Sequence, residues 1–477
     1  MHGRCAATVI TQALEESDMK RSFDAIVIGS GQAGPALAVR LASAGLHTAF
    51  IEREHYGGTC VNDGCTPTKT MVASARVAHL ARRAADFGVR LGGAVSVDMA
   101  AVMARKNAVV AQSVAGLKQW LEGAAGLEIV WGHARFVSPG AVQVGDDVLE
   151  APKIFINTGG RPVVPEWPGL ADVSHLTNRS IMSLATLPEH LLVVGGSYVG
   201  LEFAQMFRRF GSRVTVLEYG DRIIAREDDE VSSAVQTLLE AEGVAFELGS
   251  RDVSVTKVGQ GMRLAFTSGR AAREVSGSHL LFAVGRRPNT DDLGLDQAGV
   301  TTDERGYIVV DDELRSNVPG IWALGDVNGR GAFTHTAYND HEIVAANLLD
   351  GQARRVSDRI PAYALFTDPP LARIGASERE VRASGRPARV GVMPMKRVAR
   401  ARERGETQGF MKVLVDGQTD QILGATLLCI EADEIIHSLL DVMAAGAPYT
   451  VIQRCMHIHP TVSELIPTLL GSLKPLD

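Results

Sequence analysis

The residues best suited to chemistry are Cys60 and Cys65, which stand five positions apart within the segment GGTCVNDGCTPTK of residues 57–69. A zinc site is disfavoured, because no Cys or His pair follows at ligand spacing. An ideal helix would hold the two Cα atoms roughly 8–9 Å apart, whereas a disulfide needs less than about 7 Å. We therefore predict a distorted helix, permitted by Gly64 and Pro67, and a strained, easily reduced disulfide.

A second candidate lies near the C-terminus, where residues 456–464 read MHIHPTVSE. His459 could carry a proton and Glu464 could orient its ring, and a thiol–disulfide reaction needs such a proton carrier. On its own this histidine would more often be structural. The cysteine pair elsewhere in the chain favours the catalytic interpretation.

The glycine-rich sequence GSGQAG of residues 29–34 lies between an apolar strand at residues 24–29 and a helix at residues 34–44. Its glycines allow a tight turn and a close approach of a pyrophosphate to the helix N-terminus. Glu52 is the last residue of the next strand, where a carboxylate can accept hydrogen bonds from ribose hydroxyls. The motif in this context predicts a dinucleotide site.

The same unit returns at residues 195–200, which read GGSYVG and carry Ser197 in place of the middle glycine. A strand at residues 191–195 precedes the motif, a helix at residues 200–210 follows it, and the next strand ends at Glu218. Two copies of one βαβ signature predict two nucleotide-binding domains.

The order of elements predicts an α/β chain with two Rossmann-like dinucleotide-binding domains, followed by an α+β domain with antiparallel segments near residues 409–415 and 422–425. We expect Met19 to be the natural start and the residues before it to be poorly ordered. The predicted divisions are an extension at 1–18, a first nucleotide-binding domain at 19–163 that resumes at 291–357, a second at 164–290, and a C-terminal domain at 358–477.

Composition narrows the function classes. A net charge of −7 leaves no basic footprint for nucleic acid or an anionic membrane. No apolar run is long enough to span a bilayer. Five cysteines in 477 residues do not make a secreted disulfide scaffold. We expect a cytoplasmic protein with no nucleic-acid partner, no membrane partner and no resident metal.

Taken together, the cysteine segment and the His-Pro-Thr-x-x-Glu sequence at residues 459–464 resemble the FAD-dependent pyridine nucleotide–disulfide oxidoreductases, over about residues 22–470. The resemblance implies FAD in the first nucleotide site and NAD(P)H in the second. It also implies that Cys60 attacks the substrate and that Cys65 faces the flavin. In such proteins the C-terminal histidine acts at the cysteine pair of the partner subunit, which implies a homodimer with shared active sites.

The resemblance also implies a residue set for each site. Lys69 would lie beside the flavin and pair with Glu202, and Tyr198 would cover the nicotinamide pocket. The catalytic set is Cys60, Cys65, Lys69, Glu202, His459 and Glu464. The FAD set is Gly29, Gly31, Gly34, Glu52, Gly58, Thr59, Lys69, Ala134, Thr158, Gly159 and Asp326. The NAD(P) set is Gly195, Gly196, Tyr198, Gly200, Glu218 and Gly285. A carboxylate at Glu218 favours NADH over NADPH, although Arg222 stands nearby.

The acceptor is the open question. Residues 156–159 and 226–228 look most like mercuric reductases and a related reactive-chlorine resistance flavoprotein, but residues 474–477 hold no vicinal cysteine pair of the mercuric reductase kind. Glutathione reductases bind their substrate's carboxylates with two arginines, and the positions that align are Val39 and Glu342. Neither can bind a carboxylate, so glutathione disulfide is a poor candidate.

We therefore predict an NAD(P)H-dependent flavoprotein that reduces a small oxidised thiol, a reactive oxidant or a metal ion such as Hg(II) or Cu(II). The enzymatic alternatives are a dihydrolipoamide dehydrogenase-like enzyme and a mercuric reductase proper. A flavin-binding redox sensor or scaffold without enzymatic activity is a further alternative, but it has no need for His459 and Glu464.

Overall fold

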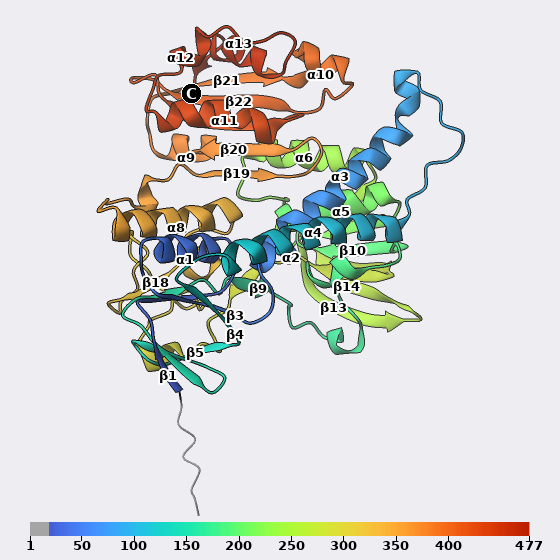
Figure 1. The fold of residues 1–477 in the computed structure, drawn as a ribbon. Helices are drawn as coiled ribbons and strands as arrows, with labels where there is room; N and C mark the ends of the chain where they lie inside the picture. Colours follow the sequence, from blue (N-terminus) through green and yellow to red (C-terminus); the bar gives the residue numbers. More distant parts are fainter. Residues whose placement is uncertain (1–18, 477) are drawn as a thin grey trace, which may run out of the picture.

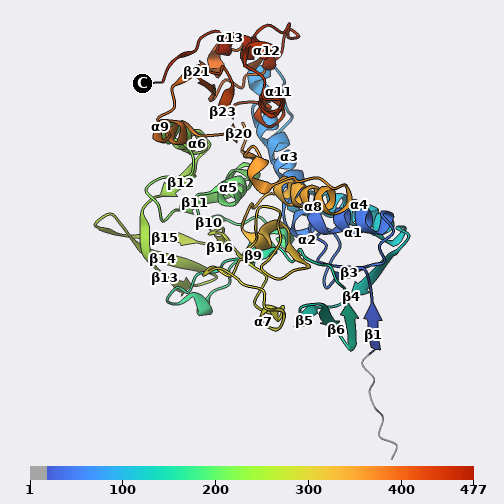
Figure 2. The same cartoon turned by 90° about the vertical axis from the view of Figure 1, so that its left-hand side faces the viewer.

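A computed structural model describes residues 19–476, and the expected N-terminal extension at residues 1–18 lies outside them. The described chain forms three parts (Figure 1). The two nucleotide-binding parts lie side by side at the bottom, and the C-terminal part stands above them. Figure 2 shows the same stacking from the side.

The first nucleotide-binding part is built on a parallel five-stranded sheet. Its strands run in the order β18 (Ile321–Ala323), β8 (Ile154–Ile156), β2 (Ala25–Ile28), β3 (Thr48–Glu52) and β4 (Leu127–Trp131). Strands β2 and β8 are fully buried apolar runs, and β3 is fully buried with an apolar centre, as expected for strands covered on both faces. Helices α1 (Ala33–Ser43) and α8 (Thr334–Leu349) pack against each other (Figure 1). Strand β18 and helix α8 thus return to a sheet that began almost 300 residues earlier.

Smaller elements complete this part. A second sheet runs in the order β1 (Met19–Ser22), β7 (Asp147–Glu150), β6 (Ala141–Val144) and β5 (Ala134–Ser138). The remaining helices are α2 (Gly58–Asn62), α3 (Cys65–Arg82), α4 (Met99–Glu122) and α7 (Leu295–Ala298). The chain passes to and from the second part through the antiparallel pair β9 (Gly160–Pro162) and β17 (Arg286–Pro288).

The second part repeats the parallel plan on a smaller scale. Its parallel sheet runs in the order β12 (Val244–Glu247), β11 (Arg213–Leu217), β10 (His190–Val194) and β16 (His279–Phe282). Helices α5 (Tyr198–Phe210) and α6 (Asp229–Ala241) accompany it, with an antiparallel sheet of β13 (Ser250–Val258), β14 (Gly261–Ser268) and β15 (Ala271–Gly277). Helix α5 begins at Tyr198 rather than at Gly200, where the sequence analysis placed it.

The C-terminal part is an antiparallel six-stranded sheet with helices. Its strands run in the order β19 (Ala362–Leu365), β20 (Leu371–Gly375), β23 (Ile422–Leu428), β22 (Phe410–Asp416), β21 (Ala388–Pro394) and β24 (Lys474–Pro475). The helices are α9 (Glu378–Ala383), α10 (Ala399–Glu403), α11 (Ala432–Ala444), α12 (Thr450–Gln453) and α13 (Ile466–Leu470). The predicted α/β class with two Rossmann-like parts and a C-terminal α+β part is confirmed. Across residues 19–476, no helix combines the length and the apolar character that a membrane crossing needs.

Candidate active site

One continuous cavity of about 2930 Å³ runs between the three parts of the chain. Pockets for single small ligands occupy roughly 300–1,000 Å³, so this cavity has room for two dinucleotides and an acceptor. Its lining includes the cysteine pair, Lys69 and Glu202. Of the predicted FAD set it includes every residue except Gly34, and of the NAD(P) set every residue except Gly196 and Gly200.

The first glycine motif has the backbone that a dinucleotide needs. Gly29 adopts φ +103°, a left-handed conformation that favours glycine. A Cβ on Gly34 would lie 2.1 Å from the Gly29 carbonyl oxygen, so helix α1 can pack this closely only without a side chain there. The buried Glu52 carboxylate accepts the Ser30 backbone N–H at 2.8 Å, which places the acid beside the loop. The open backbone amides and this carboxylate fit the pyrophosphate and ribose of FAD.

The second motif is built in the same way despite Ser197. A Cβ on Gly200 would lie 2.0 Å from the Gly195 carbonyl oxygen. Ser197 is in an extended conformation, φ −110° and ψ −172°, which any residue adopts, so the missing middle glycine carries no backbone penalty. Glu218 accepts the Gly196 backbone N–H at 2.6 Å and thus holds the position that Glu52 holds in the first motif.

The two cysteines lie on either side of a break between helices. Helix α2 ends at Asn62 and α3 begins at Cys65. The break falls at Gly64, whose φ −130° and ψ −119° are not helical, and a Cβ there would lie 2.8 Å from the Thr59 carbonyl oxygen. Cys60 and Cys65 are both free thiols in this structure, within hydrogen-bonding reach of each other.

The surroundings shift the pKa values of the two thiols in opposite directions. Hydrogen bonding from Cys60 lowers the pKa of Cys65, and Thr334, whose Oγ1 lies 3.1 Å from the Cys65 sulfur, lowers it further, as does the charge on Lys69. The same contact with Cys65, together with burial, raises the pKa of Cys60. At neutral pH the pair is therefore a Cys65 thiolate beside a protonated Cys60.

The lowered pKa of Cys65 has a measurable consequence. In the dithiol form of the protein, Cys65 should remain a thiolate down to about pH 6, the value to which its pKa is lowered. The ultraviolet thiolate absorbance, taken as the difference between wild type and Cys65→Ser, should fall by half near that pH. A midpoint near the ordinary cysteine value of about 8.5 would show that Thr334 and Lys69 do not act on the thiol.

Lys69 connects the cysteine helix to the second nucleotide-binding part. Its ammonium forms an ion pair with Glu202 of α5. The other Glu202 oxygen accepts the Phe366 backbone N–H at 2.9 Å, and the Lys69 ammonium lies 4.4 Å from the centre of the Phe366 ring. These contacts hold a positive charge near Cys65, where it lowers the pKa of the thiol.

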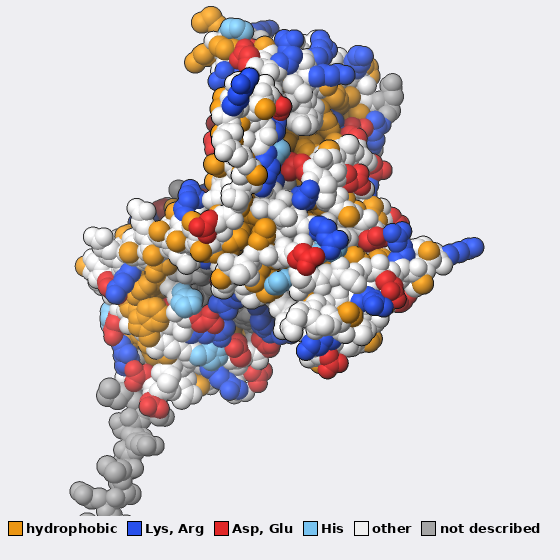
Figure 3. Space-filling model, turned by 90° about the vertical axis from the view of Figure 1, so that its right-hand side faces the viewer, with side chains coloured by type: hydrophobic (Ala, Val, Ile, Leu, Met, Phe, Trp, Pro, Cys, Tyr) orange, Lys and Arg blue, Asp and Glu red, His pale blue; other side chains and the backbone are white. Residues whose placement is uncertain are grey.

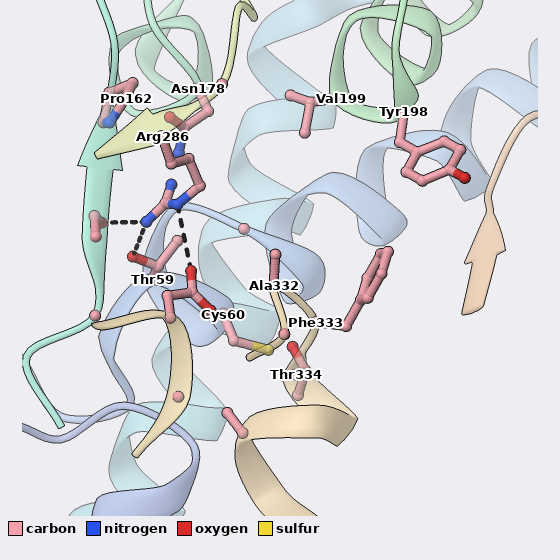
Figure 4. Close-up of a pocket in the computed structure, with 18 of the residues that line it drawn as sticks. Thr59, Cys60, Pro162, Asn178, Tyr198, Val199, Arg286, Ala332, Phe333 and Thr334 are labelled. Carbon is pink, nitrogen blue, oxygen red and sulfur yellow. Dashed lines mark hydrogen bonds and ion pairs between the residues drawn. The ribbon is translucent and has the colours of Figure 1, made fainter. Parts of the chain in front are cut away.

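Asp326 faces an arginine that the sequence analysis did not single out. Its carboxylate lies 3.4 Å from the Arg286 Nε, and burial raises its pKa. Arg286 also donates to the Thr59 hydroxyl at 3.2 Å, and Figure 4 shows the guanidinium reaching from one side of the cavity toward Thr59 and Cys60. The one available signal in the sequence was its position directly after Gly285, a member of the predicted NAD(P) set.

His459 and Glu464 form the expected pair, but outside the cavity. The Glu464 Oε2 lies 2.7 Å from the His459 Nδ1, and the His459 side chain is 73% exposed. Their loop joins α12 to α13 at the outer end of the C-terminal part, far from α2 in both ribbon views (Figures 1 and 2). Within one chain the structure therefore does not bring this pair to Cys60.

The loop that carries His459 is also unusually apolar for an exposed segment. Met456 is 98% exposed and Ile458 is 79% exposed, and Figure 3 shows apolar side chains standing out from the top of the molecule. These two side chains make the loop a candidate contact surface for another protein.

The positions aligned with glutathione-binding arginines hold no cation. Val39 packs against the core of the first nucleotide-binding part. Glu342 accepts from the Asn339 side chain at 2.6 Å and lies 3.8 Å from Arg354. Among the described residues, no group of three or more His, Cys, Asp or Glu side chains is arranged to hold a metal ion.

Two family models match the chain. The model described as pyridine nucleotide-disulphide oxidoreductase matches residues 23–340, and the model of the dimerisation domain of the same family matches residues 361–470.

Individual proteins match over nearly the full chain. The probable pyridine nucleotide-disulfide oxidoreductase RclA of Escherichia coli is 36% identical, with 95% of this chain and 99% of that protein covered. A mercuric reductase of Streptomyces lividans is 34% identical, with 93% and 94% covered. Among solved structures, a Cu(II) complex of RclA from Escherichia coli, described as an HOCl-induced flavoprotein disulfide reductase, superposes with a TM-score of 0.86 at 35% identity, with 94% of this chain and 99% of that chain covered.

Proposed function

This chain belongs to the pyridine nucleotide-disulphide oxidoreductase family, and from that premise we propose that it passes electrons from NADH or NADPH, through FAD and Cys60–Cys65, to a small acceptor. The observation that carries the proposal is the placement of the cysteine pair in the cavity that also holds both nucleotide loops. A dithiol whose members differ in pKa is suited to attack through one sulfur and to keep the other as a thiolate.

The residues present fit the two cofactors. Gly29, Gly31 and Glu52 would hold the FAD pyrophosphate and ribose, and Asp326 would hold its ribityl chain. Gly195 and Glu218 would hold the nicotinamide nucleotide, with Tyr198 at the side of its nicotinamide pocket. FAD, when bound, takes two electrons from the nicotinamide and makes them available to the disulfide.

The chain's own side chains account for the reduction of a disulfide acceptor. His459 of the partner subunit takes the proton of Cys60, the resulting Cys60 thiolate attacks one sulfur of the acceptor, and the departing thiol takes that proton from His459 of the partner subunit. The Cys65 thiolate then attacks the Cys60 sulfur, which closes the Cys60–Cys65 bridge and releases the second thiolate, and this thiolate takes its proton from solvent. The pair loses two electrons, and the acceptor gains two electrons and two protons.

The homodimer follows from the dimerisation domain, and the sharing of active sites is part of the proposal. Two features support sharing. His459 lies away from the cavity of its own chain, and the loop around it exposes Met456 and Ile458. A C₂ dimer would bring this loop to the partner's cavity and the partner's loop to this one.

For the acceptor we propose an oxidised thiol, a reactive oxidant or a soft metal ion. The names of the relatives support these three classes. Dihydrolipoyl dehydrogenases bear on a thiol, an HOCl-induced reductase on a reactive oxidant, and a mercuric reductase and the Cu(II) complex of the HOCl-induced reductase on a metal ion. A cytoplasmic location is part of the proposal, because a dithiol pair is kept reduced in that compartment.

Rates of NADH oxidation against a single acceptor panel test the proposal. The panel holds lipoamide, glutathione disulfide, cupric and mercuric ions, hypothiocyanite and quinones. We expect feeble turnover of glutathione disulfide, because Val39 and Glu342 supply no cation for its carboxylates. A protein that is yellow as purified yet oxidises neither NADH nor NADPH with any acceptor would be a flavin-binding sensor or scaffold instead.

The nicotinamide preference is a prediction of its own. Glu218 should favour NADH, because its carboxylate accepts the 2′-hydroxyl and repels a 2′-phosphate. Arg222, the nearby cation that could bind a 2′-phosphate, is paired with Asp229 and donates to the Ala225 carbonyl at 3.0 Å. Initial rates with each nucleotide measure the preference. Rates favouring NADPH by about 10-fold or more would point to Arg251, which lies over the Tyr219 ring in the same cavity.

A further inference from the structure

A buried carboxylate outside the predicted site receives three hydrogen bonds. Glu227 is 0% exposed. Its Oε1 accepts the Tyr198 hydroxyl at 2.8 Å and the Tyr363 hydroxyl at 2.7 Å, and its Oε2 accepts from the Arg373 guanidinium at 2.6 Å. A buried carboxylate is stable only when it is paired and hydrogen-bonded in this way.

The donors come from two different parts of the chain. Tyr198 is the first residue of α5, in the second nucleotide-binding part. Tyr363 and Arg373 lie on β19 and β20 of the C-terminal part and are direct cross-strand partners. Tyr363 and Arg373 of the C-terminal part thus fix the position of Glu227. Glu227 in turn accepts a hydrogen bond from Tyr198, the first residue of α5.

Tyr198 is the one member of this cluster in the predicted nicotinamide site. Its ring packs against Tyr363 at 5.6 Å and against Phe333 at 6.2 Å between ring centres. Phe333 directly precedes Thr334, which contacts the Cys65 sulfur. Figure 4 shows the Tyr198 ring at the side of the cavity, with its hydroxyl directed away from Cys60 and Thr334.

The hydroxyl is a permanent donor. Burial, and then the charge of Glu227, raise the pKa of Tyr198 far above neutral. The ring is therefore tied to a charged acceptor that is itself tied to Arg373. A hydrogen bond to a charged group shifts an equilibrium between bound and free positions by about 10-fold or more.

We infer that Glu227 is a positioning residue that fastens the Tyr198 ring at the side of the nicotinamide pocket. The inference rests on the proposed function, because it assigns the pocket beside Tyr198 to the nicotinamide. With the hydroxyl held, the pocket is open and ready for the nucleotide. With the hydroxyl released, the ring spends part of its time in the pocket, and the apparent affinity falls in proportion to the fraction of protein that is open.

A structural role alone is the competing explanation. Other buried ion pairs join the same two parts of the chain, such as Lys412 with Asp228 at 3.0 Å, and the predicted nucleotide sites include neither of these residues. Glu227 differs because one of its three donors belongs to the nicotinamide site. The test must therefore separate nucleotide affinity from stability.

Tyr198→Phe is the suitable variant, because it removes only the hydroxyl and keeps the Glu227–Arg373 ion pair. Glu227→Gln would leave Arg373 buried without its charge partner and could fail to fold. Tyr363→Phe is the matched control, because it removes the other hydroxyl from the same carboxylate oxygen while Arg373 still holds Glu227.

Stopped-flow reduction of the flavin-loaded dimer by NADH gives the apparent Kd for the nucleotide. Tyr198→Phe should raise this Kd about 10-fold, and Tyr363→Phe should change it by less than about twofold. Reoxidation of chemically reduced protein by the best acceptor should be unchanged in Tyr363→Phe. A Tyr198→Phe Kd within about twofold of wild type, or equal shifts in both variants, would overturn the inference. Wild type that NADH does not reduce would instead overturn the proposed function.

Discussion

Substitution of His459 by alanine should lower turnover with a disulfide acceptor by roughly 10²–10⁴-fold, the usual contribution of a positioned acid or base. Cys60 must attack as a thiolate and the departing thiol must take a proton, and both steps need the imidazole. Glu464, 2.7 Å from the ring, orients it. Steady-state rates with the best disulfide of the panel measure the loss.

The same variant should still be reduced by NADH, because electron transfer into the cysteine pair uses no proton from His459. A stopped-flow experiment in the absence of acceptor checks this. Metal-ion reduction should suffer less, since no thiol has to leave. His457→Ala is the matched control, because this neighbouring half-buried histidine has its Nδ1 beside the Cys455 carbonyl, at 3.2 Å, and no carboxylate partner within residues 19–476.

Two results would contradict the role given to His459. One is loss of reduction by NADH, which would mean that the substitution disturbs the cavity itself. The other is full turnover with a disulfide, which would leave the proton carrier unidentified. Equal losses in His457→Ala and His459→Ala would indicate damage to the loop rather than to an acid–base group.

A hybrid dimer should recover about half of wild-type turnover when one chain carries Cys60→Ser and the other carries His459→Ala. Each substitution alone should nearly abolish disulfide turnover. If His459 serves the partner's cysteines, one of the two sites in this hybrid joins an intact Cys60 to an intact His459. Two different affinity tags allow the hybrid to be purified free of both parent dimers.

The control places both substitutions on one chain and pairs it with a wild-type chain. Each site then lacks one of the two groups, so this dimer should be almost inactive. If the two groups instead acted within one chain, the results would be reversed, with the control about half active and the first hybrid inactive. The experiment thus tests the shared site directly.

The sequence by itself determined the features that depend on local backbone geometry. The glycine motif at residues 29–34 is a turn, a helix start and a close helix–strand contact within one short stretch. A Cβ on Gly34 would lie only 2.1 Å from the Gly29 carbonyl oxygen, which shows why the spacing is strict. The helix break between Cys60 and Cys65 follows in the same way from five residues of chain and the reach of a disulfide. Such features are readable because every interacting atom lies close by in sequence.

Only the tertiary structure decided which side chains meet across the three parts. Arg286 reaches Thr59 and Asp326, and Arg373 reaches Glu227, 146 positions away in the chain. None of these contacts leaves a pattern in the sequence, because an arginine on a strand or loop has the same local preferences whether or not a carboxylate faces it. The partner of each buried charge depends on how separate sheets pack together. For the same reason, only the tertiary structure shows that His459 lies away from the cavity of its own chain, because this depends on how the C-terminal part packs against the two nucleotide-binding parts.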